Sequence, residues 1–418
     1  MPGDHIVADG NGSLSVNGVE LHEDYLKPGR SASDLAFDVT VPAGHVWVMG
    51  DNRTHSADSR AHCSNEPADV QRGILCTGEV YKTYVKLTFA RGAALGDLGL
   101  GVAAPQHPLV DGPEAVELVD VPAPADPRQV TIEVKAAGVA FPELLQTRGL
   151  YQMKPDLPFV PGAEVAGVVT AAPEGSGFAA GDRVAALTML GGFAEVAQAS
   201  PDLTFRLPDE VGFEAGAAFT FNYATVYFAL LERGHLAEGE TVLVHGAAGG
   251  IGTAAIQMAK AFGAGKVIGV VSTEAKGEIA RAAGADEVVL ADGFLDAVGK
   301  ASVDVVVDPV GGDRFTDSLR ALREHGRLLV IGFTAGDIPQ VKVNRLLLNN
   351  ISVVGVGWGA YAMPRPGHIG TEWEAMLPHL RSGALDPVLG TTYPLEEAAA
   401  AIGSLETRQV TGKVLLLP

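Results

Sequence analysis

Three glycines, Gly246, Gly249 and Gly252, separate an apolar run at residues 242–245 from a helix-like stretch at residues 253–260. Because glycine has no side chain, such a turn lets backbone N–H groups approach a pyrophosphate at the positive end of the helix dipole. The spacing predicts a phosphate-binding turn whose candidate contacts are Gly246, Gly249, Gly250, Ile251 and Gly252. The alternative is a turn that serves only packing.

The segments after this turn alternate between strand and helix patterns. An apolar run at 266–271 is followed by a helix-like stretch at 275–283 and by predicted strands at 287–290, 303–307 and 327–331. This alternation favours a parallel sheet with helices on both faces. Together with the turn, it predicts a doubly wound dinucleotide-binding domain of the α/β class.

The end of the second predicted strand indicates which nicotinamide cofactor the domain takes. An NAD site usually has an acidic residue there for the ribose 2′-hydroxyl. Here Ser272 and Thr273 offer hydroxyls and Lys276 offers a positive charge, which suits a 2′-phosphate and favours NADPH. Two alternatives stay open, since Glu274 could take the acidic role and Lys276 could be an ordinary solvated lysine at a helix start.

Composition narrows the possible partners. The chain has 418 residues, enough for two or three domains, and a formal net charge of −20. This charge disfavours nucleic acid and anionic membranes as main partners, because both need a basic surface. No apolar run is long enough to span a membrane, no secretory signal is visible, and the two cysteines exclude a disulfide framework. The cytoplasm is therefore the expected compartment.

The first 90 residues differ from the rest and predict a small antiparallel β-rich fragment, with short alternating strands at 13–18 and 37–41. Residues 91–109 are expected to be a linker. Residues 2–6, 14–18, 25–26, 44–53 and 56–60 resemble motifs in the C-terminal half of type I signal peptidases.

The resemblance implies a serine nucleophile and a lysine base at positions that come before the proline-glycine-aspartate motif. The sequence begins at that motif, so the fragment is expected to be inactive. Ser56 matches a serine that orients the missing lysine, and Asp58 and Arg60 match a structural ion pair. A working signal peptidase is the least favoured function.

From about residue 110 to its end, the chain resembles the zinc-free quinone oxidoreductases of the medium-chain dehydrogenase/reductase superfamily. The motifs lie at residues 136–143, 148–151, 158–167, 181–184, 221–227 and 412–415, besides the glycine turn. The resemblance implies a GroES-like β-barrel catalytic domain into which the dinucleotide-binding domain is inserted. The expected boundaries are 110–225 and 358–418 for the catalytic domain and 226–357 for the cofactor domain.

The zinc-binding positions of this superfamily carry no metal ligands here. The stretch of the first ligand, residues 138–141, contains no cysteine, and the second ligand's position falls at Ala163. A catalytic metal is therefore expected to be absent. Without a Lewis acid an isolated carbonyl is hard to polarise, whereas a quinone or an α,β-unsaturated carbonyl is already electron-poor. The expected reaction is hydride transfer from NADPH to such an acceptor.

The resemblance also assigns residues to the cofactor. Asn222 and Thr225 match residues near the nicotinamide and phosphates, and Lys413 matches a late position near the cofactor. Two segments that follow predicted strands complete the expected site, namely residues 308–311 and the run Gly332, Phe333 and Thr334.

Departures from the family leave the chemistry partly open. Many relatives have asparagine and aspartate where this chain has Ala140 and Glu143, so a cofactor-binding protein without turnover is the alternative function. Tyr151, Tyr223 and Tyr361 are candidate proton donors, although each could be a wall residue and solvent could deliver the proton. Residues 350–358 predict an edge strand, and the resemblance implies a homodimer through this edge.

Overall fold

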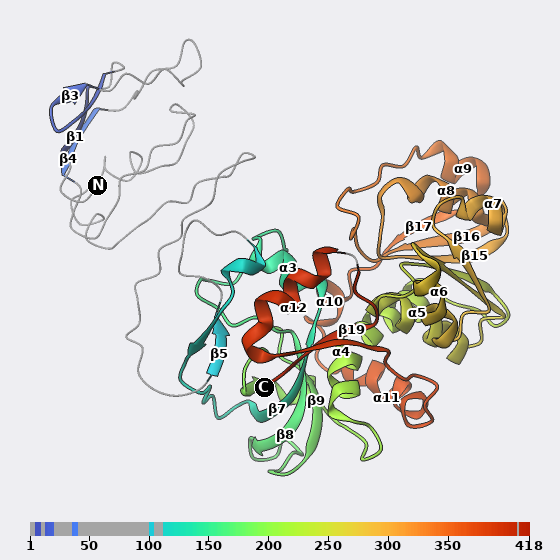
Figure 1. Cartoon of the computed structure of the whole chain (residues 1–418), viewed down its shortest axis with the longest axis horizontal. Helices are drawn as coiled ribbons and strands as arrows, with labels where there is room; N and C mark the ends of the chain where they lie inside the picture. Colours follow the sequence, from blue (N-terminus) through green and yellow to red (C-terminus); the bar gives the residue numbers. More distant parts are fainter. Residues whose placement is uncertain (1–4, 10–12, 21–35, 41–99, 104–111, 408) are drawn as a thin grey trace. The chain divides into compact units, whose positions relative to one another are not determined.

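A computed structural model describes residues 5–9, 13–20, 36–40, 100–103, 112–407 and 409–418 (Figure 1). The chain divides into two units, one of residues 1–93 and 106–109 and one of residues 94–105 and 110–418. The motifs at residues 44–53 and 56–60 and both cysteines lie outside the described residues.

The described part of the first unit is a four-stranded antiparallel sheet in the order β3-β2-β1-β4. Its strands are β1 (His5–Asp9), β2 (Leu14–Val16), β3 (Val19–Glu20) and β4 (Ala36–Thr40). Asn17 and Gly18 join β2 to β3 with positive φ angles, as a two-residue hairpin turn requires. The short strands expected at residues 13–18 and 37–41 are present as Leu14–Val16 and Ala36–Thr40, whereas residues 17 and 18 form the turn and residue 41 lies outside the described residues.

A larger sheet in the second unit, antiparallel except for one parallel pair at its edge, forms the barrel-like part of the chain. Its strand order is β11-β9-β8-β7-β19-β18, and β10 also pairs with β7. Inward-facing residues of β7, among them Val130, Ile132 and Val134, are buried in its core. The strands are β7 (Val130–Val139), β8 (Glu164–Ala171), β9 (Arg183–Leu187), β10 (Val196–Ala199), β11 (Thr204–Arg206), β18 (Leu389–Pro394) and β19 (Lys413–Leu417).

A short strand lies in the segment that the sequence predicted to be a linker. Leu100–Ala103 form β5, which pairs antiparallel with β6 (Glu117–Asp120). The sequence predicted no strand at these four residues, so their pairing with β6 is an addition to the predicted elements.

The second sheet is parallel throughout and has the order β14-β13-β12-β15-β16-β17. Its strands are β12 (Thr241–His245), β13 (Lys266–Val271), β14 (Glu287–Leu290), β15 (Val303–Asp308), β16 (Leu322–Val330) and β17 (Ser352–Gly355). The chain leaves the barrel sheet before β12 and returns to it at β18 and β19, where β19 pairs with β7. The predicted doubly wound domain inserted in a β-barrel domain is confirmed.

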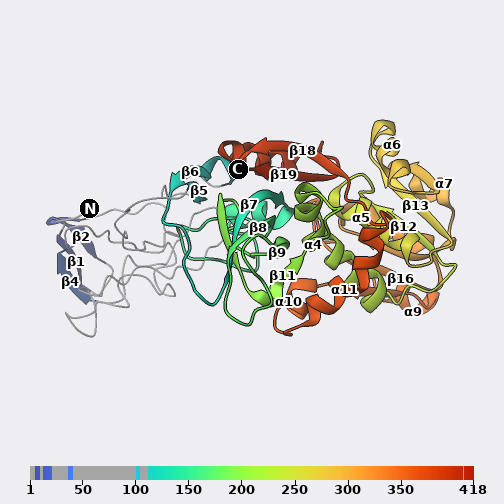
Figure 2. The same ribbon diagram turned by 90° about the horizontal axis from the view of Figure 1, so that it is seen from below.

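Helices cover both faces of the parallel sheet (Figures 1 and 2). On β12, Val242 and Val244 face a core that includes α5, whereas Leu243 faces a separate core that includes α7 and α8. The α-helices are α3 (Phe141–Thr147), α4 (Phe213–Tyr227), α5 (Gly250–Ala261), α6 (Glu274–Ala282), α7 (Phe294–Val298), α8 (Phe315–Ala321), α9 (Asn344–Asn349), α10 (Trp358–Ala362), α11 (His368–Arg381) and α12 (Ala398–Ser404).

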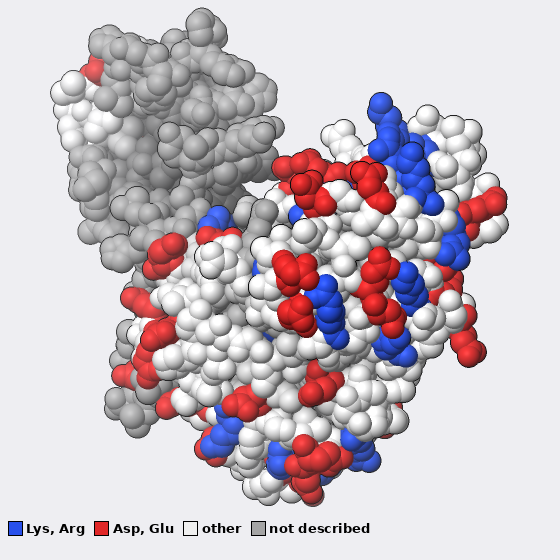
Figure 3. Space-filling model, turned by 45° about the vertical axis from the view of Figure 1, so that its right-hand side comes forward, with Lys and Arg blue, Asp and Glu red and all other residues white. Residues whose placement is uncertain are grey.

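Short helical turns complete the chain. Helix α4 continues into a π-helical turn, η3 (Phe228–Arg233). The 3-10 turns are η1 (Pro113–Ala115), η2 (Pro201–Leu203), η4 (Gly312–Arg314), η5 (Leu395–Glu397) and η6 (Leu405–Thr407). None of the helices in the described residues is long and apolar enough to cross a membrane. Acidic and basic side chains are interspersed over the face shown in Figure 3.

Candidate functional site

The glycine turn joins β12 to α5 with very little room for side chains. Gly246 has φ +60°, a conformation that favours glycine. A Cβ on Gly252 would lie 2.1 Å from the carbonyl oxygen of Gly246 and 2.7 Å from Cα of Ala247. Both neighbours are backbone atoms, so only glycine allows this close approach. The turn therefore presents the N-terminus of a twelve-residue helix without covering side chains.

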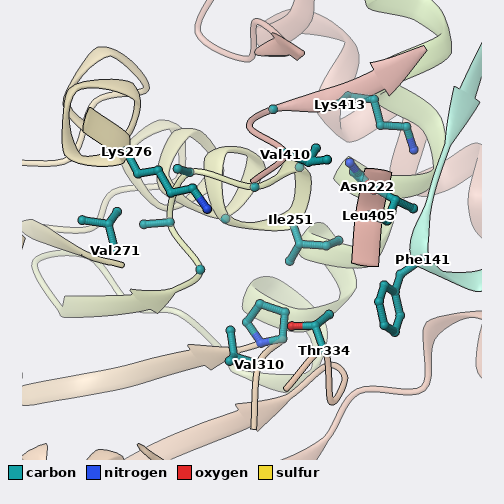
Figure 4. Close-up of a pocket in the computed structure, with 18 of the residues that line it drawn as sticks. Phe141, Asn222, Ile251, Val271, Lys276, Val310, Thr334, Leu405, Val410 and Lys413 are labelled. Atoms are coloured by element: carbon teal, nitrogen blue, oxygen red, sulfur yellow. The ribbon is translucent and has the colours of Figure 1, made fainter. Parts of the chain in front are cut away.

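A cavity of about 290 Å³ opens directly over this turn. Figure 4 shows Lys276 and Phe141 towards opposite ends of this cavity, with Ile251 between them. Its walls come from both parts of the second unit. The turn after β12, the start of α5 and the end of β13 belong to the cofactor domain, and the end of β7 and the start of β19 belong to the barrel sheet. All five predicted turn residues line it: Gly246, Gly249, Gly250, Ile251 and Gly252.

The returning chain is fixed directly to the glycine turn. The Gly412 N–H donates to the carbonyl of Ala248 at 2.8 Å, and Gly249 and Gly412 form an isolated parallel bridge. This contact sets Lys413, the first residue of β19, into the cavity wall. Backbone bonding thus couples the barrel sheet to the phosphate-binding turn.

The end of β13 carries the residues expected at the ribose. Ser272 and Lys276 line the cavity, whereas Thr273 does not. Instead the Thr273 hydroxyl caps α6 by accepting from the Lys276 backbone N–H at 3.4 Å. Glu274, the alternative acidic residue, pairs with Arg281 at 2.9 Å and lies outside the cavity lining. The cavity therefore presents a hydroxyl and a cation at this end.

Behind the cavity wall formed by the ends of β7 and β19 lie two buried carboxyl groups, those of Glu143 and Glu164, and one buried amine, that of Lys413. Lys413 Nζ donates to Glu164 Oε1, and Glu164 Oε2 accepts from Thr220 Oγ1 and the Phe221 N–H, both at 2.8 Å. Glu143 is fully buried, and burial raises its pKa to about 7 although the charge of Lys413 opposes the rise. Lys413 thus supplies positive charge to both carboxylates.

The residues at the superfamily's zinc positions do not fit a metal ion. Glu143 Oε2 accepts from the Ala140 N–H and Oε1 accepts from the Ala163 N–H, both at 2.9 Å. Alanine has no ligand atom, and backbone donors already occupy both oxygens of the nearest carboxylate. This place therefore offers no set of ligands for a catalytic metal ion.

The remaining predicted cofactor residues divide into two groups. Asn222, Thr334 and Lys413 line the cavity, whereas Thr225, Gly332 and Phe333 do not. The Thr225 hydroxyl is turned back onto its own helix, where it donates to the carbonyl of Phe221 at 2.8 Å. From the predicted segment 308–311, Pro309 and Val310 reach the cavity. Asp308 instead accepts from the N–H groups of Val310 and Gly311 and so holds the loop closed.

None of the three candidate proton donors lines the cavity. Tyr223 is buried in the core, where it stacks on Phe219 and donates to Gln257 at 2.6 Å. Tyr361 is 39% exposed and lies under the guanidinium of Arg365. The placement of these two residues does not support their assignment as proton donors, because neither lines the cavity. Tyr151 is half-buried, and burial together with the charge of Glu143 raises its pKa.

Sequence reasoning missed Arg314, which lines the cavity from η4. The signal was its place four residues beyond Val310, in the segment that follows β15. Arg314 also acts on His245, whose ring is fully buried and bonded to Ser318 at 2.7 Å. Burial, opposed by Asp308 and reinforced by Arg314, lowers the pKa of His245 to about 4, so this histidine is neutral near pH 7.

Three protein families match parts of the chain. The alcohol dehydrogenase GroES-like domain matches residues 126–220, and the zinc-binding dehydrogenase family matches residues 250–380. The signal peptidase S26 family matches residues 1–73. The first match covers β7 to β11 of the barrel sheet, and the second covers β13 to β17 of the parallel sheet. The third agrees with the resemblance at the N-terminus.

Individual relatives agree with these matches. Quinone oxidoreductase-like protein 2 of Rattus norvegicus is 36% identical over 302 residues, which is 71% of this chain and 86% of the relative. The crystal structure of a probable oxidoreductase from Mycobacterium abscessus is 43% identical with a TM-score of 0.68, covering 77% of this chain and 99% of that one. The Escherichia coli quinone oxidoreductase complexed with NADPH is 31% identical with a TM-score of 0.68, covering 76% and 100%.

Proposed function

This chain belongs to the quinone oxidoreductase family of the medium-chain dehydrogenases/reductases, and from that premise we propose that it is an NADPH-dependent, metal-independent reductase of quinones or α,β-unsaturated carbonyl compounds. The observation that carries the proposal is one cavity that joins a bare glycine turn, a cation beside the end of β13, and an apolar wall from the barrel sheet.

The residues present fit the cofactor. Gly246 and Gly252 keep the turn clear of side chains, so backbone N–H groups at the start of α5 can hold a pyrophosphate. Asn222, Thr334 and Lys413 would hold the nicotinamide half from the other walls. When bound, NADPH supplies the hydride that the acceptor takes up.

Lys276 and Ser272 support a preference for NADPH over NADH. Both line the cavity, and the only acidic residue of this loop, Glu274, is engaged with Arg281. A lysine and a hydroxyl favour a 2′-phosphate, whereas an NAD site would offer a carboxylate to the 2′-hydroxyl. The Escherichia coli relative, solved with NADPH, agrees with this preference.

The acceptor end of the cavity favours a conjugated substrate. Val139, Ala140 and Phe141 form an apolar wall there, and no metal ligand is available at Ala163. Such a wall excludes water and positions an acceptor, but it does not polarise an isolated carbonyl. The reduced product would take its proton from solvent, since Tyr151, like the other two candidate tyrosines, does not line the cavity.

We also propose that the chain forms a homodimer through β17. This strand lies at the edge of the parallel sheet, and exposed Leu347 and Leu348 of α9 precede it. An apolar sheet edge is a template for pairing with a second copy. Light scattering coupled to gel filtration would give the mass of a dimer, and a monomer at micromolar concentration would refute this part.

An acceptor panel in chelator-treated buffer tests the proposed reaction. NADPH oxidation, followed at 340 nm, should proceed with 1,4-benzoquinone, a naphthoquinone or an enone and should fail with a simple ketone. The absence of turnover with every quinone and enone would sink the proposal. Quenching of NADPH fluorescence without consumption of NADPH would instead support the second candidate function, a cofactor-binding protein without turnover. Ala140 favours this candidate, because it places a methyl group in the cavity wall where many relatives have an asparagine amide.

A further inference from the structure

A histidine and two glutamates meet away from the cavity, at the junction of two helices. Glu232 lies on the π-helical turn η3, and His368 and Glu372 lie on α11, which packs against α4. His368 and Glu372 are four residues apart, so they share one face of α11. None of the three lines the cavity of the proposed reaction.

The separations match those of ligands around one small ion. His368 Nε2 lies 3.3 Å from Glu232 Oε1 and 3.4 Å from Glu372 Oε1, and all three ligand atoms lie within 4.8 Å of one another. Two ligands that each lie about 2.1 Å from a tetrahedral ion are separated by about 3.4 Å. One ion can therefore contact all three side chains with only small adjustments.

Two of the three ligand atoms also lack hydrogen-bond partners. Within the described part of the chain, His368 Nε2 and Glu372 Oε1 are buried atoms without a hydrogen bond. The Glu372 side chain is 1% exposed, and its other oxygen accepts from Trp358 Nε1 at 2.9 Å. Buried polar atoms without partners are costly. The bond from Trp358 orients Glu372 in the way that outer residues orient metal ligands.

The local charge also favours a cation. Glu232 and Glu372 approach the His368 imidazole from two different elements, η3 and α11, and each places one carboxyl oxygen within 3.4 Å of Nε2. A dication at this place would be attracted by both acidic side chains.

We propose that Glu232, His368 and Glu372 form a binding site for a zinc-like divalent ion that ties η3 to α11. One imidazole and two carboxylates in a small site suit Zn²⁺, whereas Mg²⁺ and Ca²⁺ prefer a larger set of oxygen ligands. Glu232 and His368 are 30% and 19% exposed, so an ion can enter from solvent. The fourth ligand would be water, and the role of the ion would be structural.

Metal counting on the full chain tests this site. After treatment with a chelator, the protein is dialysed against Zn²⁺ and the bound metal is measured by mass spectrometry and by calorimetric titration. Glu372→Gln and His368→Gln should each bind one Zn²⁺ fewer than the wild type or bind it at least about tenfold more weakly, since even outer-shell changes cost this much. Glu374→Gln, which removes an exposed carboxylate from the same helix, should match the wild type.

A second measurement does not depend on the folding of the variants. Anomalous scattering at the zinc edge from wild-type crystals should place a peak about 2.0–2.2 Å from His368 Nε2. Equal zinc content and affinity in the wild type and Glu372→Gln, or no anomalous peak beside His368, would overturn the site. Mg²⁺ at the same concentration should not displace the zinc, and displacement would refute the assignment to a zinc-like ion.

Discussion

Replacement of Lys276 by alanine tests how the chain would choose between NADPH and NADH. Lys276 lies on the first turn of α6 and lines the cavity beside Ser272. Burial lowers its pKa from that of a free lysine, so the amine is partly shielded from water where it would meet a phosphate. Alanine keeps the helix and removes only the stem and the charge.

The size of the effect follows from the kind of bond that is lost. A hydrogen bond to a charged group contributes about 1.5–3 kcal/mol, and each 1.4 kcal/mol is a factor of ten in affinity. Because Lys276 is only partly buried and salt screens exposed charges, the lower part of this range applies. The Kd for NADPH should therefore rise by about 10–30-fold, whereas the Kd for NADH should change by less than about threefold.

Fluorescence titration of each cofactor with each protein measures these constants at fixed ionic strength. Lys260→Ala is the matched control, because Lys260 pairs with Asp286, just before β14, and does not line the cavity. This control should leave both constants unchanged. If Lys276→Ala raised the Kd for NADPH and the Kd for NADH by the same factor, the assignment of Lys276 to the 2′-phosphate would be refuted.

Three further substitutions test the turn and the buried charges. Gly252→Ala places a Cβ 2.1 Å from a backbone oxygen, and the resulting overpacking should cost about 1–3 kcal/mol. NADPH binding should therefore weaken in fluorescence titrations. Gly403→Ala is the control, because its Cβ would lie 3.7 Å from the nearest atom and should leave binding unchanged. Lys413→Met leaves Glu164 and Glu143 without their cation. The free energy of unfolding, measured in urea, should fall by about 3–5 kcal/mol. A fall of less than about 1 kcal/mol would contradict a stabilising role of the buried Lys413–Glu164 ion pair. Glu143 has its pKa raised from 4.5 to about 7, so its contribution to stability is complete below pH 4.5 and is lost as the pH rises to 7, a loss of about 3 kcal/mol. Glu143→Gln should therefore reduce the difference in melting temperature between pH 5 and pH 8, and an unchanged difference would speak against the raised pKa.

Much of the fold could be predicted because its signals are local. The apolar runs at 266–271 and 287–290 coincide with β13 and β14, since buried parallel strands are continuous in hydrophobicity. The edge strand was overestimated: residues 350–358 were expected, but only Ser352–Gly355 pair, because Trp358 already starts α10. The strand Leu100–Ala103 was missed because its partner β6 lies beyond a segment with no strand signal.

The site was less predictable because cavity lining depends on side-chain direction. Ser272 and Thr273 are neighbours with similar hydroxyls, yet one lines the cavity and the other caps α6. Tyr223 lies next to Asn222 on α4, but adjacent helical residues point about 100° apart, so the tyrosine faces the core. The place of Arg314 in the cavity wall and the ion pair of Lys413 with Glu164 both result from contacts between distant parts of the chain. The spacing of residues in the sequence does not reveal such contacts.

The most direct test of the proposed reaction is the balance between NADPH consumed and hydroquinone formed, measured without oxygen and with a metal chelator present. One hydroquinone should appear for each NADPH oxidised, and the rate should not change with chelator concentration. NADPH that is bound but not consumed, or a rate that falls with chelator and returns with added zinc, would contradict the proposed reaction.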